Sequence, residues 1–180
     1  LSFYIHIPYC VKRCGYCDFN TYTPGELKEG SDIAQVSNGY IDLLIQEAKV
    51  ARSEVKTTGP IPTIFFGGGT PTLMEPTDLG RVLNSLEADF GFAKNIEITI
   101  EANPDTVSKE KLAALRETGI NRISFGMQSA APHVLAVLDR THNPDNVVKA
   151  TNWAREVGFE QVSVDLIYGT PGESIADWEA

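Results

Sequence analysis

The sequence contains no run of about 18 consecutive apolar residues, which is the length that a membrane-spanning helix needs. Its first residues carry no basic segment, so they do not resemble a secretory signal peptide. Basic residues are also scarce, because 15 Lys and Arg stand against 24 Asp and Glu and leave a net charge of −9. Nucleic acid backbones are bound by clustered Lys and Arg. We therefore expect no transmembrane segment and no nucleic acid partner.

Cysteine is equally rare, since the only three in the chain are Cys10, Cys14 and Cys17. Unpaired thiols without a signal peptide indicate a reducing compartment, so we expect a cytoplasmic protein. A disulfide would pair two of the thiols, leave the third alone and close a very short loop. Thiolates are soft ligands that select zinc, copper(I) or iron–sulfur clusters. The triplet therefore predicts a metal centre.

The spacing Cys-x3-Cys-x2-Cys leaves two kinds of metal centre open. It differs from the zinc ribbon, which repeats Cys-x2-Cys, and from the bacterial ferredoxin run of four cysteines. Three thiolates leave one coordination position empty, and in catalytic metal sites that position belongs to the substrate. An iron–sulfur cluster with one open iron is one interpretation. A structural zinc site with His6 as the fourth ligand is the alternative.

Strand and helix patterns alternate along the chain and predict an α/β fold. The predicted strands cover residues 2–7, 63–66, 95–101, 122–126 and 161–167. Helices are expected from about Gly39 after a polar stretch, over 79–90, from Ser108, after Pro132, after Pro144 and from Ser174. Strands joined by helical crossovers lie parallel. We expect an incomplete (β/α)6 TIM-like barrel, with a doubly wound sheet as the alternative.

Both architectures place ligands at the carboxyl ends of the strands. There the chain carries the cysteines, the Gly67-Gly-Gly-Thr70 run, Glu101, Gln128 and Asp165. Three glycines would let backbone amides approach a ligand closely and let carbonyls accept from its ammonium, and neither phosphate-loop consensus is present. Taken singly, a tight turn or a solvated carboxylate explains each group as well. Their common location predicts one site under the cysteines.

Motifs along nearly the whole chain resemble the oxygen-independent coproporphyrinogen III oxidase-like branch of the radical S-adenosylmethionine (SAM) superfamily. The motifs are Tyr4-Ile-His6-Ile-Pro-Tyr-Cys10-x3-Cys14-x2-Cys17, Phe66-Gly-Gly-Gly-Thr-Pro-Thr72, Glu101-Ala-Asn-Pro, Ser124-Phe-Gly-Met-Gln128-Ser, Leu138-Asp-Arg140-Thr-His142 and Asp165-Leu-Ile-Tyr-Gly-Thr-Pro-Gly172. The resemblance implies a [4Fe-4S] cluster on Cys10, Cys14 and Cys17, with SAM bound to the open iron. It implies two sets of cofactor contacts: Tyr4, Gly68, Gly69, Thr70 and Glu101 around cluster-bound SAM, and Tyr16, Gln128, Arg140 and Asp165 around a SAM or substrate-side ligand.

Phe19 distinguishes two groups within this branch. The oxidases have a fourth cysteine two positions after the third, where this chain has Phe19. The resulting Asp-Phe-Asn version resembles the haem chaperone (HemW-like) group, which implies binding of haem and its transfer to apo-haem proteins. The alternative is oxidative decarboxylation of coproporphyrinogen III, a porphyrinogen, to protoporphyrinogen IX. We expect residues 1–180 to be one radical SAM core domain, ending before the last barrel unit and a C-terminal haem-binding region.

Overall fold

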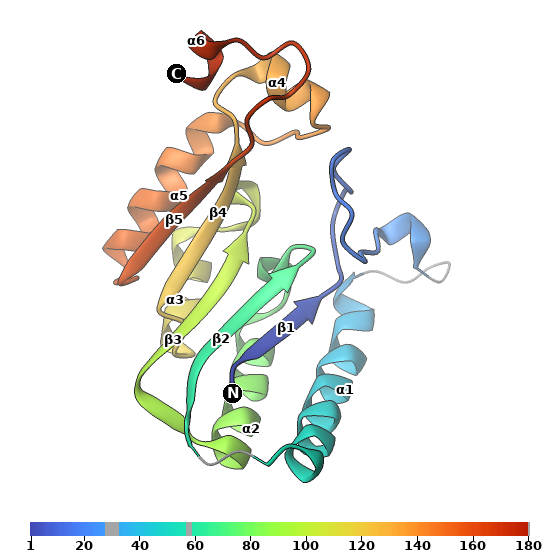
Figure 1. Ribbon diagram of the computed structural model, residues 1–180, viewed down its shortest axis with the longest axis vertical. Coiled ribbons are helices and arrows are strands. Elements are labelled where there is room, and N and C mark those ends of the chain that lie inside the picture. Colours follow the sequence, from blue (N-terminus) through green and yellow to red (C-terminus); the bar gives the residue numbers. More distant parts are fainter. Residues whose placement is uncertain (28–32, 57–58, 180) are drawn as a thin grey trace.

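The computed structural model describes residues 1–27, 33–56 and 59–179. Its strands are β1 (Phe3–Ile7), β2 (Ile61–Gly68), β3 (Phe92–Ala102), β4 (Arg122–Gln128) and β5 (Gln161–Leu166). They form one parallel sheet in which each strand pairs with the next along the chain, in the order β1-β2-β3-β4-β5 (Figure 1). A doubly wound sheet would reverse this order at a switch point. The sheet is therefore part of a TIM-like barrel, as predicted.

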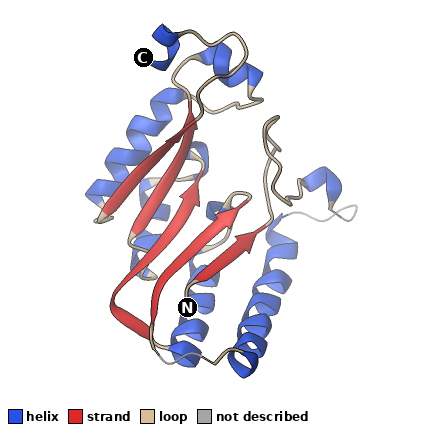
Figure 2. Ribbon diagram, viewed as in Figure 1, coloured by secondary structure: helices blue, strands red, loops and turns tan. Residues whose placement is uncertain are grey.

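Helices follow the strands; the longer ones cover one face of the sheet, and the short ones lie beyond the carboxyl ends of the strands (Figure 2). They are α1 (Ile33–Glu54), α2 (Pro76–Phe90), α3 (Lys109–Glu117), α4 (Pro132–Val137), α5 (Pro144–Glu156) and α6 (Ile175–Trp178), with 3-10 turns at Pro24–Glu26, Pro71–Leu73 and Pro104–Thr106. The core lies between this helical layer and the sheet, where Phe66, Ile100, Phe125 and Leu112 are fully buried. None of the helices within the described ranges is long and apolar enough to cross a membrane.

Several elements begin earlier than their sequence pattern predicted. Helix α1 is already formed at Ile33, inside the stretch that we expected to be polar and irregular, because Ile33 and Val36 pack against the core. Strand β2 begins at Ile61 and passes through Pro62, which is exposed and needs no ladder hydrogen bond there. The predicted N-cap of α3 is confirmed, since the Ser108 hydroxyl accepts a hydrogen bond from the Lys111 amide at 3.2 Å.

The parallel register places a set of polar side chains on the sheet face that the helices leave open. Thr99 lies opposite Arg122, Glu101 opposite Ser124, and Ser124 in turn opposite Ser163. Because side chains alternate between the two faces of a strand, the neighbours of these residues are the buried core side chains. Polar groups of β3, β4 and β5 therefore share one surface, which becomes the floor of the site.

Candidate functional site

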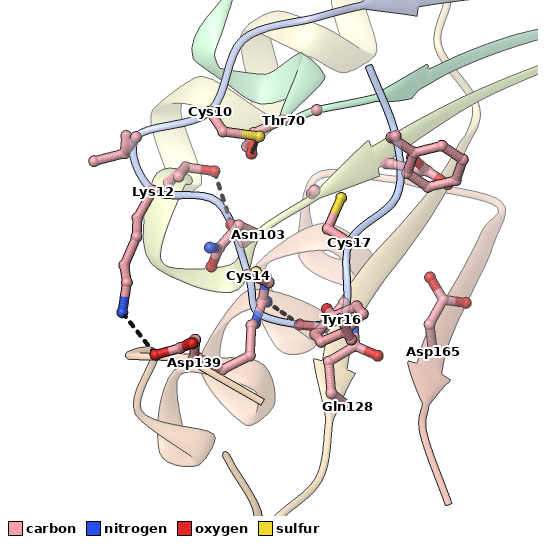
Figure 3. A pocket seen from close by; sticks show the side chains of 18 of the residues that line it. Cys10, Lys12, Cys14, Tyr16, Cys17, Thr70, Asn103, Gln128, Asp139 and Asp165 are labelled. Carbon is pink, nitrogen blue, oxygen red and sulfur yellow. Dashed lines mark hydrogen bonds and ion pairs between the residues drawn. The ribbon is translucent and has the colours of Figure 1, made fainter. Parts of the chain in front are cut away.

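A cavity of about 820 Å³ lies between the open sheet face and the segment of residues 8–22, here called the cysteine loop. Figure 1 shows this loop, in blue, beyond the carboxyl ends of the strands and on the same side as α4. Figure 3 shows the cysteines on one wall and Asp165 on another. The cavity is lined by Cys10, Val11, Lys12, Cys14, Tyr16, Cys17, Asp18, Phe19, Gly68, Gly69, Thr70, Glu101, Ala102, Asn103, Asp105, Thr106, Ser124, Gly126, Gln128, Asp139, Arg140, Thr141 and Asp165.

The cysteine loop holds three free thiols on a backbone that is tied at both ends. The Cys10 amide donates to the Tyr22 carbonyl at 3.0 Å, and the Tyr22 amide donates to the Pro8 carbonyl at 2.6 Å. Between them, the Cys17 amide donates to the Cys14 carbonyl and closes a tight turn. Burial raises the pKa of the Cys10 thiol, while a contact from the Thr70 hydroxyl at 3.8 Å opposes this effect.

The geometry of the loop differs from that of a single-ion zinc site. In the part of the chain that the structure describes, no three His, Cys, Asp or Glu side chains are close enough to hold one metal ion. A tetrahedral zinc ion with Zn–S bonds of about 2.3 Å would bring its sulfurs to roughly 4 Å from one another. A [4Fe-4S] cluster takes one thiolate per iron and therefore suits thiols that are spread around a cavity.

His6 is engaged in hydrogen bonds that leave no ring nitrogen for a metal. Its Nε2 lies 2.8 Å from the Asn20 carbonyl, which only accepts, so Nε2 carries the hydrogen. Its Nδ1 then accepts from the Tyr4 hydroxyl at 3.2 Å. The alternative of a zinc site completed by His6 is therefore not supported by the geometry.

The glycine run is required by backbone packing as well as by the cavity. Gly68 has a φ of +109°, and a Cβ there would lie 2.6 Å from the His6 ring. A Cβ on Gly69 would lie 2.5 Å from the Tyr9 carbonyl oxygen. The Gly69 and Thr70 amides donate to the Ile7 and Tyr9 carbonyls, each at 2.7 Å. The expectation that the glycine amides approach a ligand is therefore wrong for Gly69, because β1 already uses its amide, and the start of the cysteine loop likewise uses the Thr70 amide.

Glu101 reaches the cavity from the end of β3. Burial raises the pKa of its carboxyl, and the nearby charge of Asp165 raises it further. The Gly68 amide donates to Glu101 at 3.3 Å and lowers the pKa in part. A cation that enters the cavity would stabilise the ionised form of Glu101, because the protein alone offers little compensation for its negative charge.

Asp165 is positioned by the Ser124 hydroxyl of the neighbouring strand. The Ser124 hydroxyl lies 3.0 Å from both carboxylate oxygens of Asp165, and the Ser163 hydroxyl donates to Ser124 at 2.8 Å. Arg122 donates to Ser163 and so continues this chain of hydrogen bonds across the sheet. The carboxylate of Asp165 is thereby held at the cavity surface.

Gln128 reaches the same cavity from the end of β4, and Arg140 reaches it from the segment after α4. The Arg140 guanidinium donates to the Gly126 carbonyl at 2.6 Å and contacts the Cys14 sulfur at 3.6 Å. Gln128 is buried and has a φ of 65°, a conformation that residues other than glycine rarely adopt. Burial raises the pKa of Tyr16, which lines the cavity beside them.

Of the cofactor contacts that the sequence suggested, Tyr4 is the one that does not line the cavity. Its ring is exposed, stacks on Phe65 and lies against Gly67, next to Glu101. The others line the cavity together with the cysteines, while their roles in binding stay predictions. Lys12 and Asp139, which were not predicted from the sequence as site residues, form an ion pair of 3.5 Å at the rim (Figure 3). No spacing rule joins two positions so far apart in the sequence.

Comparison with known proteins identifies relatives of this chain. Residues 4–180 match the family described as the radical SAM superfamily. The chain is 43% identical over 175 residues to the haem chaperone HemW of Mycobacterium tuberculosis, covering 97% of this chain and 43% of the relative. It is 38% identical over 180 residues to HemW of Bacillus subtilis, covering 99% of this chain and 45% of the relative. The chain thus spans less than half the length of these relatives.

A solved structure has the same fold. The coproporphyrinogen III oxidase HemN of Escherichia coli, described as a radical SAM enzyme, superposes with a TM-score of 0.85 at 31% identity. The match covers 99% of this chain and 39% of the oxidase.

Proposed function

Since the chain belongs to the radical SAM superfamily, a family that implies a [4Fe-4S] cluster and SAM, we propose that it forms the cofactor-binding core of a haem chaperone. In this proposal the protein binds haem and delivers it to apo-haem proteins in the cytoplasm. The observation that carries the proposal is the identity of 43% along nearly the whole chain to a protein named as a haem chaperone.

The cysteine loop fits the cluster that the family implies. Cys10, Cys14 and Cys17 are the ligands in our proposal, because they are free, line one cavity and are the only thiols in the chain. Thr70 and Arg140 each direct a donor at one of these sulfurs, and such donors stabilise the charge on a ligating thiolate. When bound, the cluster and SAM supply one-electron chemistry.

The charge of the cavity fits SAM, which carries a sulfonium and an ammonium group. Among the described residues that line the cavity, the carboxylates are Asp18, Glu101, Asp105, Asp139 and Asp165, and the cations are Lys12 and Arg140. Clefts lined by one sign of charge concentrate ligands of the opposite sign. We assign Glu101 and Asp165 to the polar groups of SAM, and Gly68, Gly69 and Thr70 to the wall beside the open iron.

The same charge disfavours the alternative function. Coproporphyrinogen III carries four carboxylates and haem carries two, so the acidic lining of this cavity repels coproporphyrinogen III more strongly. Phe19 stands where the oxidases have their fourth cysteine, and its ring is 59% exposed at the cavity rim. An apolar ring supplies neither a thiol nor a proton, and it suits a flat apolar partner such as a porphyrin face. The likeness to the oxidase HemN is the observation that favours the alternative.

One experiment separates the two functions. The full-length protein, reconstituted anaerobically, is mixed with SAM and a reductant, and is offered either haem or coproporphyrinogen III. We expect a haem complex with a shifted Soret band and no protoporphyrinogen. Phe19→Cys should not restore conversion, because one thiol does not change the charge of the cavity. Multiple turnovers of coproporphyrinogen III by the wild type would instead establish the oxidase.

A further inference from the structure

His142 is a buried histidine next to the site that neither the cluster nor SAM explains. It lies two residues after Arg140, on the segment that leads from α4 to α5, and it does not line the cavity. Its Nδ1 lies 3.3 Å from Arg140 Nε. Because a guanidinium only donates, Nδ1 must accept, and the ring is bound in a form that carries no hydrogen on Nδ1. Burial lowers the pKa of His142, and the charge of Arg140 lowers it further, which favours the neutral ring.

The Arg140 guanidinium is thereby held by three different partners. Its Nε donates to His142, one terminal nitrogen donates to the Gly126 carbonyl at 2.6 Å, and the other lies 3.6 Å from the Cys14 sulfur. The planar guanidinium makes these three directions interdependent, because fixing two of its nitrogens sets the place of the third. His142 and Gly126 thus determine where Arg140 meets Cys14.

The same segment also holds the backbone around Cys14. The Gly15 amide donates to the Leu138 carbonyl at 3.2 Å, and Lys12 pairs with Asp139. Cys14 and Arg140 are therefore brought together across 126 positions of sequence by contacts on both sides of them. The contact between guanidinium and sulfur belongs to a docked loop and is not an isolated approach of two side chains.

We infer that His142 is a positioning residue that holds the Arg140 guanidinium on the Cys14 sulfur and so raises the reduction potential of the cluster. The inference rests on the [4Fe-4S] cluster of the proposed function. A donor and a positive charge at a ligating sulfur stabilise the reduced cluster, which carries one more negative charge than the oxidised cluster. Without its acceptor at Nδ1, the guanidinium is free to leave the sulfur, and the reduced cluster loses this stabilisation.

The test is a redox titration of the reconstituted protein without SAM, followed by the EPR signal of the reduced cluster. His142→Leu removes the acceptor and fills most of the same volume, so the midpoint potential should become more negative. His142→Asn should keep most of the wild-type potential, because its Oδ1 occupies nearly the place of Nδ1. Arg140→Gln should shift the potential at least as far as His142→Leu does. The control His133→Leu changes an exposed histidine outside the cavity lining and should shift nothing.

Iron content and potential distinguish the possible failures. A wild type that does not load about four irons overturns the proposed function and this inference with it. Full loading with an unchanged potential in His142→Leu overturns the inference alone. So does a shift in His142→Asn as large as in His142→Leu, because the accepting atom is then not the cause. An unchanged potential in Arg140→Gln overturns it as well, whether or not His142→Leu folds.

Discussion

Glu101→Gln should weaken SAM binding strongly while leaving the fold intact. The substitution keeps the shape of the side chain and an oxygen that accepts from the Gly68 amide, and it removes the negative charge. A hydrogen bond to a charged group contributes about 1.5–3 kcal/mol. Loss of that contribution corresponds to a SAM affinity that is about 10-fold to 150-fold lower. Because Glu101 is half-buried, we expect the loss of SAM affinity to lie above the lower end of this range.

The assay is anaerobic calorimetry of the reconstituted protein with SAM. The matched control is Glu97→Gln, which changes a carboxylate of the same strand that bonds to Thr99 and does not line the cavity. The control should bind SAM as the wild type does. An unchanged SAM affinity in Glu101→Gln, at full iron content, would refute the assignment of Glu101 to the ligand.

The raised pKa of Glu101 gives the prediction a second signature. Wild-type affinity should fall as the pH is lowered toward that raised pKa, at pH values where an ordinary glutamate is still ionised, and this part of the decline should be absent in Glu101→Gln. A carboxyl whose pKa is raised on folding also makes the folded state less stable once it ionises. The neutral variant should therefore not lower the melting temperature of the cluster-free protein at neutral pH.

Three further outcomes are expected. Cys14→Ala should abolish the brown colour and the bound iron of the reconstituted protein, whereas iron retained in full would exclude Cys14 as a ligand. Gly68→Val should disturb the cysteine loop and reduce both iron content and SAM binding, since its side chain would meet the His6 ring at a left-handed backbone position; normal values of both would contradict this packing. Leu112→Ala should lower the free energy of unfolding by about 2–5 kcal/mol in urea denaturation, with the exposed Val148→Ala within about 0.5 kcal/mol as the control.

The sequence alone predicted the class of fold, which the structure confirms, and it supplied the cysteine triplet on which the proposed cluster rests. The alternation of strand and helix is visible in the sequence because hydrophobic periodicity and the Pro and Gly residues at element ends are local features. The cysteine triplet is local as well, because all three cysteines lie within residues 10–17. The beginning of α1 was missed because its first turns are polar in composition, and their helical state depends on Ile33 and Val36 packing against the core.

Only the tertiary structure decided how the groups of the site meet. The strand order excludes a doubly wound sheet. This order cannot be read from sequence patterns, because a barrel and a doubly wound sheet show the same alternation of strand and helix. The engagement of both His6 nitrogens depends on Tyr4 and on the distant turn of the cysteine loop. The contact of Arg140 with Cys14 joins positions 126 residues apart, and the acceptor at His142 follows from side-chain orientation. Such contacts arise from packing between elements, and local conformational propensity does not determine which elements come into contact.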